Sequence, residues 1–253
     1  MINLAIDIGN TNTHIGIFSK KLIKLSIFPT HNSSLIKDSE NIFSLLTSKG
    51  INKCAVSSVV PDYEKFWENY LEIKFNKLPL IINNKTRLPV KINVKNSNLL
   101  GADRICNAVC GYEHFGKKNN VIVIDMGTAI TYNVILKNGE FVGGVIAAGL
   151  GTAAKSLNIY TGKLPLLNKD RLLFPKTVIG DNTVSAIQSG LMNSALYAIE
   201  GMVNAIKKEK KRDFKAIITG GLAKPFHKKL SFKPVFIENT VLEGLNMIMN
   251  YNN

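Results

Sequence analysis

Residues 4–16 read Leu-Ala-Ile-Asp-Ile-Gly-Asn-Thr-Asn-Thr-His-Ile-Gly, and this stretch decides the fold that we predict. An apolar run ends at Asp7, a polar segment containing Gly9 follows, and apolar residues return at Ile15. Gly and Asn tolerate the left-handed backbone of tight turns, so the stretch predicts a β-hairpin. The N–H groups and Thr hydroxyls of such a turn suit phosphate oxygens, and Asp7 can hold a metal directly or through water. The pattern also fits an ordinary Asn/Gly hairpin whose Asp caps the turn.

A second stretch, residues 121–131, repeats this pattern as Val-Ile-Val-Ile-Asp-Met-Gly-Thr-Ala-Ile-Thr. The repetition predicts two related halves, residues 1–116 and 117–253, that face each other across a nucleotide cleft. Phosphoryl transfer needs mainly positioning and charge stabilisation, which two carboxylates and two donor-rich turns can supply. The chain contains no Gly-x-x-x-x-Gly-Lys-Ser/Thr loop, so the predicted nucleotide site is not of the Walker type.

The rest of the sequence predicts an α/β protein with two ribonuclease-H-like halves, each a mixed sheet flanked by helices. Apolar alternation and short apolar runs indicate strands at residues 21–28, 51–60, 78–82 and 216–219. Helical spacing and Pro or Gly punctuation indicate helices at residues 34–48, 61–73, 99–112, 149–157 and 241–249, and one that starts at Leu222.

The longest helical pattern covers residues 179–208. Asp181 or Asn182 can cap this helix, and its apolar residues form one stripe that includes Ile187, Leu191 and Ile199. Such a helix can be a spine of the core or the seam of a dimer. Its length in a chain of this size favours the seam.

Bulk composition limits the classes of function. The formal net charge of +14 suggests a nucleic-acid partner, but only four of the 32 basic residues are Arg, the side chain that most often reads bases. The densest basic run, residues 207–215, also contains acidic residues and lies near a predicted helix end. A solvated basic surface is therefore favoured over a nucleic-acid site, and such a surface also attracts phosphorylated substrates.

Neither a membrane anchor nor a disulfide framework is expected. No apolar run reaches the length of a membrane span, and the chain starts directly in a predicted strand rather than in a signal peptide. Cys54, Cys106 and Cys110 show no metal-type spacing with the four histidines, so we read them as reduced core thiols of a cytoplasmic protein.

Asp103 lies in the first turn of the helix predicted at residues 99–112, and its role there has two interpretations. It can be a carboxylate that favours the positive end of the helix dipole. Alternatively, it can be a base or an orienting group for a substrate hydroxyl, with Arg104 beside it as the partner of an anion.

Eight motifs, in order from the first strand to the last helix, make the chain resemble type III pantothenate kinases. They are Asp7-Ile-Gly-Asn-Thr-Asn12, Ser58-Val-Val-Pro61, Gly101-Ala-Asp-Arg104, Asp125-Met-Gly-Thr128, Gly143-Gly144, Thr161-Gly-Lys-Leu-Pro165, Thr219-Gly-Gly-Leu-Ala223 and Leu242-Glu-Gly-Leu245. The resemblance implies the actin, sugar-kinase and heat-shock-ATPase fold and a homodimer. It also implies ATP-dependent phosphorylation of pantothenate, the first step of coenzyme A synthesis, with Mg²⁺ and a monovalent cation (K⁺ or NH₄⁺).

The same resemblance implies a role for particular residues. Asp103 would be the catalytic base, and Asp125 would hold the monovalent cation. Thr183 would reach pantothenate from the partner subunit. Thr128 would touch ATP, and Gly220 and Gly221 would lie near its adenosine. The remaining implied residues are the first phosphate turn, Asp7, Ile8, Gly9, Asn10, Thr11, Asn12, Thr13 and His14, and the pantothenate pocket, Gly101, Ala102, Asp103 and Arg104.

Four positions depart from the pattern of the family. Val94 stands where the family carries Tyr on the substrate wall, and Ser97 replaces a Pro. Asn133 replaces an Asp and therefore supplies no charge, and Ala148 stands where Pro is common. None of these changes affects Asp7, Asp103 or Asp125, so we expect activity. A kinase of the same fold with another acceptor, or a non-catalytic nucleic-acid-binding regulator, are the alternatives.

Overall fold

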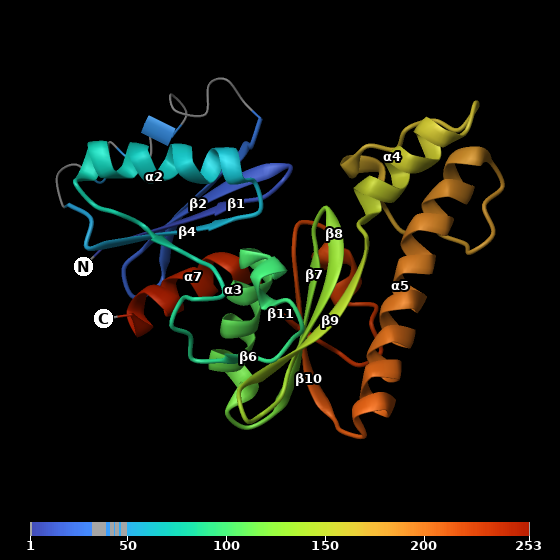
Figure 1. The fold of residues 1–253 in the computed structure, drawn as a ribbon. Helices are drawn as coiled ribbons and strands as arrows, with labels where there is room; N and C mark the ends of the chain where they lie inside the picture. Colours follow the sequence, from blue (N-terminus) through green and yellow to red (C-terminus); the bar gives the residue numbers. More distant parts are fainter. Residues whose placement is uncertain (1, 32–38, 41–42, 44–45, 47–49, 253) are drawn as a thin grey trace. The chain divides into compact units, whose positions relative to one another are not determined.

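The computed structural model describes residues 2–31, 39–40, 43, 46 and 50–252 (Figure 1). Apart from Ser39, Glu40, Phe43 and Leu46, the helix predicted at residues 34–48 lies outside the described residues. The chain divides into two compact units. Unit 1 comprises residues 1–114, 138–142 and 239–253, and unit 2 comprises residues 115–137 and 143–238.

The first sheet, in unit 1, is built on the predicted hairpin. β1 (Asn3–Ile8) and β2 (Asn12–Phe18) pair antiparallel, with Asp7 opposite His14, which confirms the hairpin. The sheet order is β3-β2-β1-β4-β5, with β3 at Leu22–Pro29, β4 at Lys53–Ser58 and β5 at Leu80–Ile81. β4 runs parallel to β1 and β5 runs parallel to β4, so the sheet is mixed, as predicted.

Alternate residues of β1 serve two different cores. Leu4, Ile6 and Ile8 pack with Trp67 and Leu71 of α2 (Pro61–Phe75), on one side of the sheet. Ala5 packs on the other side with α3 (Ala102–Gly111) and α7 (Thr240–Tyr251), and Figure 1 shows the sheet between these two helical layers. Because side chains two apart on a strand share a face, Asp7 lies on the same side as α3.

α3 and α7 pack against each other closely because of one glycine. A Cβ on Gly244 would lie 2.1 Å from the carbonyl oxygen of Cys106, so only Gly allows this approach. Leu242 and Leu245 on either side of it are buried in the same core. In the Leu242–Leu245 motif, the two Leu residues and Gly244 therefore serve to pack α7 against α3.

The second sheet has the order β11-β10-β7-β8-β9-β6. β7 (Asn120–Met126) and β8 (Ala129–Ile135) form the second predicted hairpin, and β10 (Phe214–Thr219) runs parallel to β7. Residues 121–124 of β7 are fully buried, as their uninterrupted apolar sequence predicts. The other strands are β9 (Glu140–Ala148), β11 (Val235–Phe236) and β6 (Lys91–Ile92), and the last pairs with the start of β9.

The two sheets repeat one another in strand order. The order β3-β2-β1-β4-β5 in the first sheet corresponds to β9-β8-β7-β10-β11 in the second. The repeated Asp motifs lie at equivalent places, near the ends of β1 and β7. The α/β class with two mixed sheets flanked by helices is thus confirmed.

The helices differ in detail from the predicted ones. α3 begins at Ala102 instead of 99, and a π-helical turn at Tyr112–Gly116 continues it. The long helix α5 covers Thr183–Lys210, so residues 179–182 are not helical. α4 covers Leu150–Tyr160 and packs on α5, whereas α6 covers Ala223–His227 and packs on β10 and β11. The described residues also contain two 3₁₀ turns, at Ser97–Leu99 and Lys169–Arg171.

In the part of the chain that the structure describes, every helix is too short or too polar to cross a lipid bilayer.

Candidate active site

The turn between β1 and β2, which the sequence predicts to bind phosphate, is closed by main-chain and threonine contacts. The N–H of Gly9 donates to the carbonyl oxygen of Asn12 at 3.0 Å, and the Thr30 hydroxyl donates to the carbonyl oxygen of Gly9 at 2.6 Å. Thr13 is buried, and its hydroxyl lies 3.1 Å from that of Thr30. Asn10, Thr11 and Asn12 are exposed, so the tip of the turn is the part that solvent and ligands reach. The exposed tip of the turn thus carries two Asn side chains and one Thr.

Asp7 lies beside the helix that carries Asp103. The Ser57 hydroxyl, on the neighbouring strand β4, donates to Asp7 Oδ1 at 3.0 Å. Cys106, one turn along α3, is fully buried, and its pKa is raised by burial first and then by the nearby carboxylates of Asp7 and Asp103. A side-chain hydrogen bond between Ser57 and this thiol acts on the pKa in the opposite direction. One face of the first sheet therefore brings together two of the carboxylates that the sequence singled out.

Asp103 lies in the first turn of α3 and is folded back onto its own backbone. Its Oδ1 accepts the N–H of Arg104 at 2.8 Å and lies 2.4 Å from where a Cβ on Gly101 would be. Burial raises the pKa of the Asp103 carboxyl, while the Arg104 N–H and guanidinium act in the opposite direction. Gly101 thus makes room for a carboxylate that is largely removed from water, which is typical of a functional acid or base.

The Arg104 side chain packs against an aromatic ring of the same unit. Its guanidinium lies over the ring of Phe141, with Cζ 5.6 Å from the ring centroid. Burial lowers the pKa of Arg104, although the group stays cationic at any ordinary pH. The cation–π contact fixes the side chain that the family resemblance assigns to the pantothenate pocket.

The turn between β7 and β8, in unit 2, which the sequence also predicts to bind phosphate, is held by residues at the start of α4. The carbonyl oxygen of Thr128 accepts the N–H of Gly149 at 3.0 Å and the hydroxyl of Thr152 at 2.7 Å. A Cβ on Gly149 would lie 2.2 Å from the carbonyl oxygen of Gly127. Thr128 is exposed, so its side chain faces solvent while its backbone is fixed.

Asp125 and the Gly220-Gly221 pair come together in unit 2. Asp125 pairs in register with Thr219 of β10, and Gly220 adopts φ +97°, which favours Gly. A Cβ on Gly220 would lie 2.7 Å from Asp125 Oδ1, so the carboxylate rests against this glycine. The predicted cation ligand and the predicted adenosine turn are therefore neighbours.

Sequence reasoning missed Lys169, which no motif includes. Its Nζ lies 3.0 Å from where a Cβ on Gly221 would be. Lys169 lies in the 3₁₀ turn Lys169–Arg171, about fifty positions before the glycine pair in sequence. Only the tertiary structure places this cation over the turn.

Asn133, at the position where the resemblance leads us to expect Asp, is fully buried on β8. Its Nδ2 donates to the hydroxyl of Thr131 at 3.2 Å. A buried amide with hydrogen bonds costs much less free energy than a buried carboxylate. The substitution therefore suits this interior and leaves Asp125 as the acidic group of the motif.

Thr183 is the first residue of α5, and its position is fixed by a capping box. The Asn182 side chain accepts the N–H of Ser185 at 3.0 Å, and the Ser185 hydroxyl accepts the N–H of Asn182 at 3.2 Å. Of the two caps that the sequence allows, Asn182 is the one used. Thr183 is exposed, as a residue that reaches a partner would be.

A cavity of about 640 Å³ in unit 2 contains none of the predicted site residues. It is lined by Lys118, Asn119, Asn120, Lys137, Arg212, Asp213, Phe214 and Lys215. Asp213 pairs with Lys207 at 3.7 Å, near the end of α5 where cations favour the helix dipole. Lys210 likewise pairs with Glu209 at 3.1 Å, so two of the six basic residues in the run 207–215 have an acidic partner within the run, and the run remains basic.

Comparison with solved structures defines the class of protein first. A Campylobacter jejuni protein assigned to the Baf family of transcriptional activators has a TM-score of 0.61, with 18% identity over 98% of both chains. A Listeria monocytogenes protein assigned as an N-acetylmannosamine kinase has a TM-score of 0.55, with 13% identity over 100% of both. The fold is that of the sugar-kinase-like α/β proteins.

Sequence comparison then gives the family. The model of type III pantothenate kinases matches residues 3–205. A relative described as type III pantothenate kinase, from Sulfurihydrogenibium sp. (strain YO3AOP1), is 37% identical over 98% of this chain and 99% of its own length. The chain belongs to the type III pantothenate kinase family, which confirms the resemblance read from the eight motifs.

Proposed function

We propose that this chain transfers the terminal phosphoryl group of ATP to the primary hydroxyl of pantothenate, giving 4'-phosphopantothenate, the first step of coenzyme A biosynthesis. The observation that carries the proposal is that Asp7, held by Ser57, lies on the face of the first sheet that packs with α3, the helix whose first turn contains Asp103. This arrangement, in a member of a pantothenate kinase family, supplies one carboxylate for the phosphate side of the reaction and one for the acceptor hydroxyl.

Asp103 is the group that we assign to the acceptor hydroxyl. A loose phosphoryl-transfer transition state asks little of the nucleophile until bond formation is advanced, so the base need not be strong. Asp103 orients the hydroxyl and accepts its proton late in the transfer. Arg104, fixed over Phe141, is the cationic group beside it and suits the carboxylate of pantothenate.

The charged partners of ATP are assigned to Asp7 and Asp125. Asp7 offers a partly exposed carboxylate at the end of β1, with Ser57 orienting it, and fits a Mg²⁺ ion bound directly or through water. Asp125, beside Gly220, fits a monovalent cation (K⁺ or NH₄⁺). When bound, these ions balance the charge of the phosphates, and Thr128, Gly220 and Gly221 hold the nucleotide.

The chain acts as a homodimer through α5 in this proposal. Between Thr183 and Ile199 the helix carries no charged residue. Small exposed residues recur every four positions, at Ala186, Gly190, Ser194 and Ala198. A second copy related by a two-fold axis can cover this face and bring its Thr183 to the site. The reaction belongs in the cytoplasm, where ATP is available and where the free thiols of Cys54, Cys106 and Cys110 stay reduced.

ADP release by the purified chain with ATP and Mg²⁺ tests the proposal. Turnover is expected to require pantothenate and to rise when K⁺ or NH₄⁺ is added. ATP hydrolysis that does not depend on pantothenate would point to another acceptor. If the folded chain binds ATP without any turnover, a regulatory role becomes the better explanation, and a salt-dependent shift of DNA or RNA would support it.

A further inference from the structure

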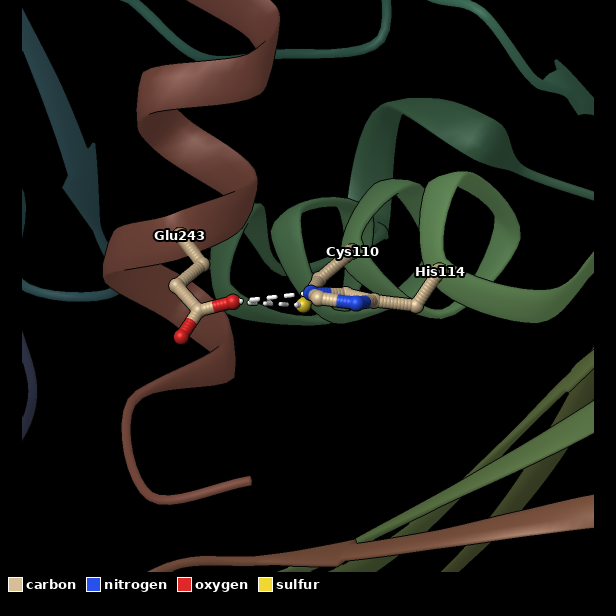
Figure 2. A group of neighbouring side chains, drawn as sticks. All are labelled: Cys110, His114 and Glu243. Carbon is tan, nitrogen blue, oxygen red and sulfur yellow. Dashed lines mark hydrogen bonds and ion pairs between the residues drawn. The ribbon is translucent and has the colours of Figure 1, made fainter. Parts of the chain in front are cut away.

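Three side chains at the far end of α3 form a group that the kinase reaction does not use. Cys110 is the penultimate residue of α3, His114 lies in the π-helical turn that continues it, and Glu243 projects from α7. Figure 2 shows the three side chains pointing toward one another across the two helices. All three residues belong to unit 1.

The distances within the group are short. His114 Nε2 lies 2.9 Å from Glu243 Oε2, and Cys110 Sγ lies 3.9 Å from the same oxygen. One ligand atom from each side chain lies within 4.8 Å of both others. A tetrahedral zinc ion with bonds of about 2.0–2.3 Å separates its ligand atoms by about 3.3–3.8 Å. The Cys110–Glu243 separation is already close to this range, and the His114–Glu243 contact reaches it by opening a few tenths of an ångström. The third pair, Cys110 and His114, lies within 4.8 Å and reaches the range by a side-chain adjustment of about 1 Å or less.

The two helices that carry the group are packed closely together. Gly244, next to Glu243, rests on the carbonyl oxygen of Cys106, one helical turn before Cys110. The spacing of Cys110 and His114 places both on one face of the continuing helix. π-Helical turns such as Tyr112–Gly116 are rare and occur frequently at functional sites.

The chemistry and access of the donors fit a zinc-class cation. Thiolate, imidazole and carboxylate are the zinc ligands of proteins, and magnesium and calcium sites use oxygen alone. Cys110 is fully buried, but the side chains of His114 and Glu243 are 36% and 32% exposed. A metal can thus enter from the solvent side, and a water molecule can complete its shell.

We propose that Cys110, His114 and Glu243 bind one divalent zinc-class cation per chain, which clamps α3 to α7. On binding, the Cys110 thiol releases its proton to solvent and the thiolate bonds to the metal. The proton that His114 Nε2 shares with Glu243 passes to solvent or moves to Nδ1, which leaves the Nε2 lone pair for the metal. Without a metal, the His114–Glu243 contact remains as a hydrogen bond or an ion pair. The clamp joins α3, whose first turn contains Asp103, to α7, so metal binding is expected to stabilise this helix pair.

Co²⁺ and Zn²⁺ binding to the full chain tests this proposal without reference to kinase activity. Co²⁺ is expected to give a thiolate-to-metal charge-transfer band, with one Co²⁺ bound per chain. Cys110→Ser removes the band, whereas Cys54→Ser, which changes another buried thiol of unit 1, keeps it. The wild-type chain and Cys54→Ser are expected to compete with a chromogenic chelator for Zn²⁺. In both proteins Zn²⁺ is expected to raise the melting temperature, and in Cys110→Ser it is not.

Glu243→Gln distinguishes a metal-binding role of Glu243 from a role limited to its hydrogen bond with His114. Gln keeps the shape and a hydrogen bond to His114 but loses the charge, so Zn²⁺ affinity is expected to fall at least about tenfold while the metal-free melting temperature changes little. The proposal is overturned if wild-type chain shows no charge-transfer band, or if Cys110→Ser binds Zn²⁺ as tightly as Cys54→Ser. An unchanged Zn²⁺ affinity in Glu243→Gln would also remove Glu243 from the ligand set.

Discussion

The Ser57 hydroxyl donates to Asp7 Oδ1 at 3.0 Å, across the parallel pair β1–β4. In the second sheet the equivalent register pair is Asp125 and Thr219, but there the Thr219 hydroxyl donates to the carbonyl oxygen of Glu238. The two halves thus repeat the position of a hydroxyl beside the motif Asp, and only the first half uses it to orient that Asp. This difference agrees with our proposal that Asp7 and Asp125 bind different cations, Mg²⁺ and a monovalent ion.

Ser57→Ala is expected to lower kcat/KM for ATP by about tenfold, because hydrogen bonds to charged groups contribute about 1.5–3 kcal/mol. The fold should survive, since Ala fills most of the same volume. Steady-state kinetics at varied Mg²⁺ measure the effect. The exposed Ser19→Ala is the matched control. Wild-type kinetics in Ser57→Ala would show that Asp7 does not depend on this hydrogen bond.

Asp103→Asn is expected to lower kcat by about 10²–10⁴-fold, the usual contribution of a positioned acid or base. Nucleotide binding should be kept, because Asn can still accept the Arg104 N–H. Single-turnover kinetics and ATP titration separate the two effects. The exposed Asp62→Asn, in the first turn of α2, controls for loss of a helix-start carboxylate. An unchanged kcat would exclude Asp103 as the base.

The raised pKa of Asp103 predicts a pH dependence of both activity and stability. Activity should fall on acidification at a higher pH than an ordinary Asp, with its pKa of about 3.9, would produce. The folded state favours the protonated carboxyl, so this stabilisation is complete below the unfolded-state pKa and is lost as pH rises through the folded-state pKa. Asp103→Asn should therefore melt at a higher temperature than wild type at neutral pH. Equal melting temperatures at neutral pH would contradict the burial of the charge.

Gly149→Ala is expected to destabilise the chain by about 2 kcal/mol or more, because its Cβ would overlap the backbone of the turn between β7 and β8. Gly151→Ala, two residues further along in α4, meets no atom within 4 Å and should be neutral or stabilising by up to about 1 kcal/mol. Thermal unfolding of the two variants gives the comparison. A larger loss in Gly151→Ala than in Gly149→Ala would disagree with the packing of this turn.

Ala198→Arg places a charge on the exposed, uncharged face of α5 and is expected to give a monomer with little activity. Light scattering after size exclusion measures the mass, and Glu72→Arg on the exposed side of α2 is the control. A monomeric wild-type chain, or an Ala198→Arg variant that is dimeric and active, would contradict the proposal that α5 forms the dimer interface.

The contribution of Thr183 from the partner is tested by mixing two weakly active variants, Asp103→Asn and Thr183→Ala. After refolding or subunit exchange, random mixing makes half of the dimers mixed, and about a quarter of all sites would regain both residues. Recovery toward a quarter of wild-type activity is therefore expected. If Thr183 serves its own chain, the mixture stays as weak as its components.

Local sequence was sufficient for the elements whose signals lie within a few residues. The Asn/Gly turn, the two apolar strands that end in Asp, and Pro61 at the start of α2 determined the hairpins, the α/β class and the family, because turn chemistry and side-chain alternation are short-range effects. The start of α5 was less certain, since both Asp181 and Asn182 can cap a helix and only the capping box with Ser185 decides between them.

Tertiary structure alone decided which of these residues meet. Asp7 and Asp103 are far apart in the chain and approach because alternate residues of β1 face α3, and Lys169 reaches Gly221 through the fold of unit 2. The spacing of Cys and His predicted no metal site, because its third donor, Glu243, comes from a helix more than a hundred residues later. The physical reason is that long-range packing, such as Gly244 against Cys106, depends on complementary surfaces that no single stretch of sequence contains.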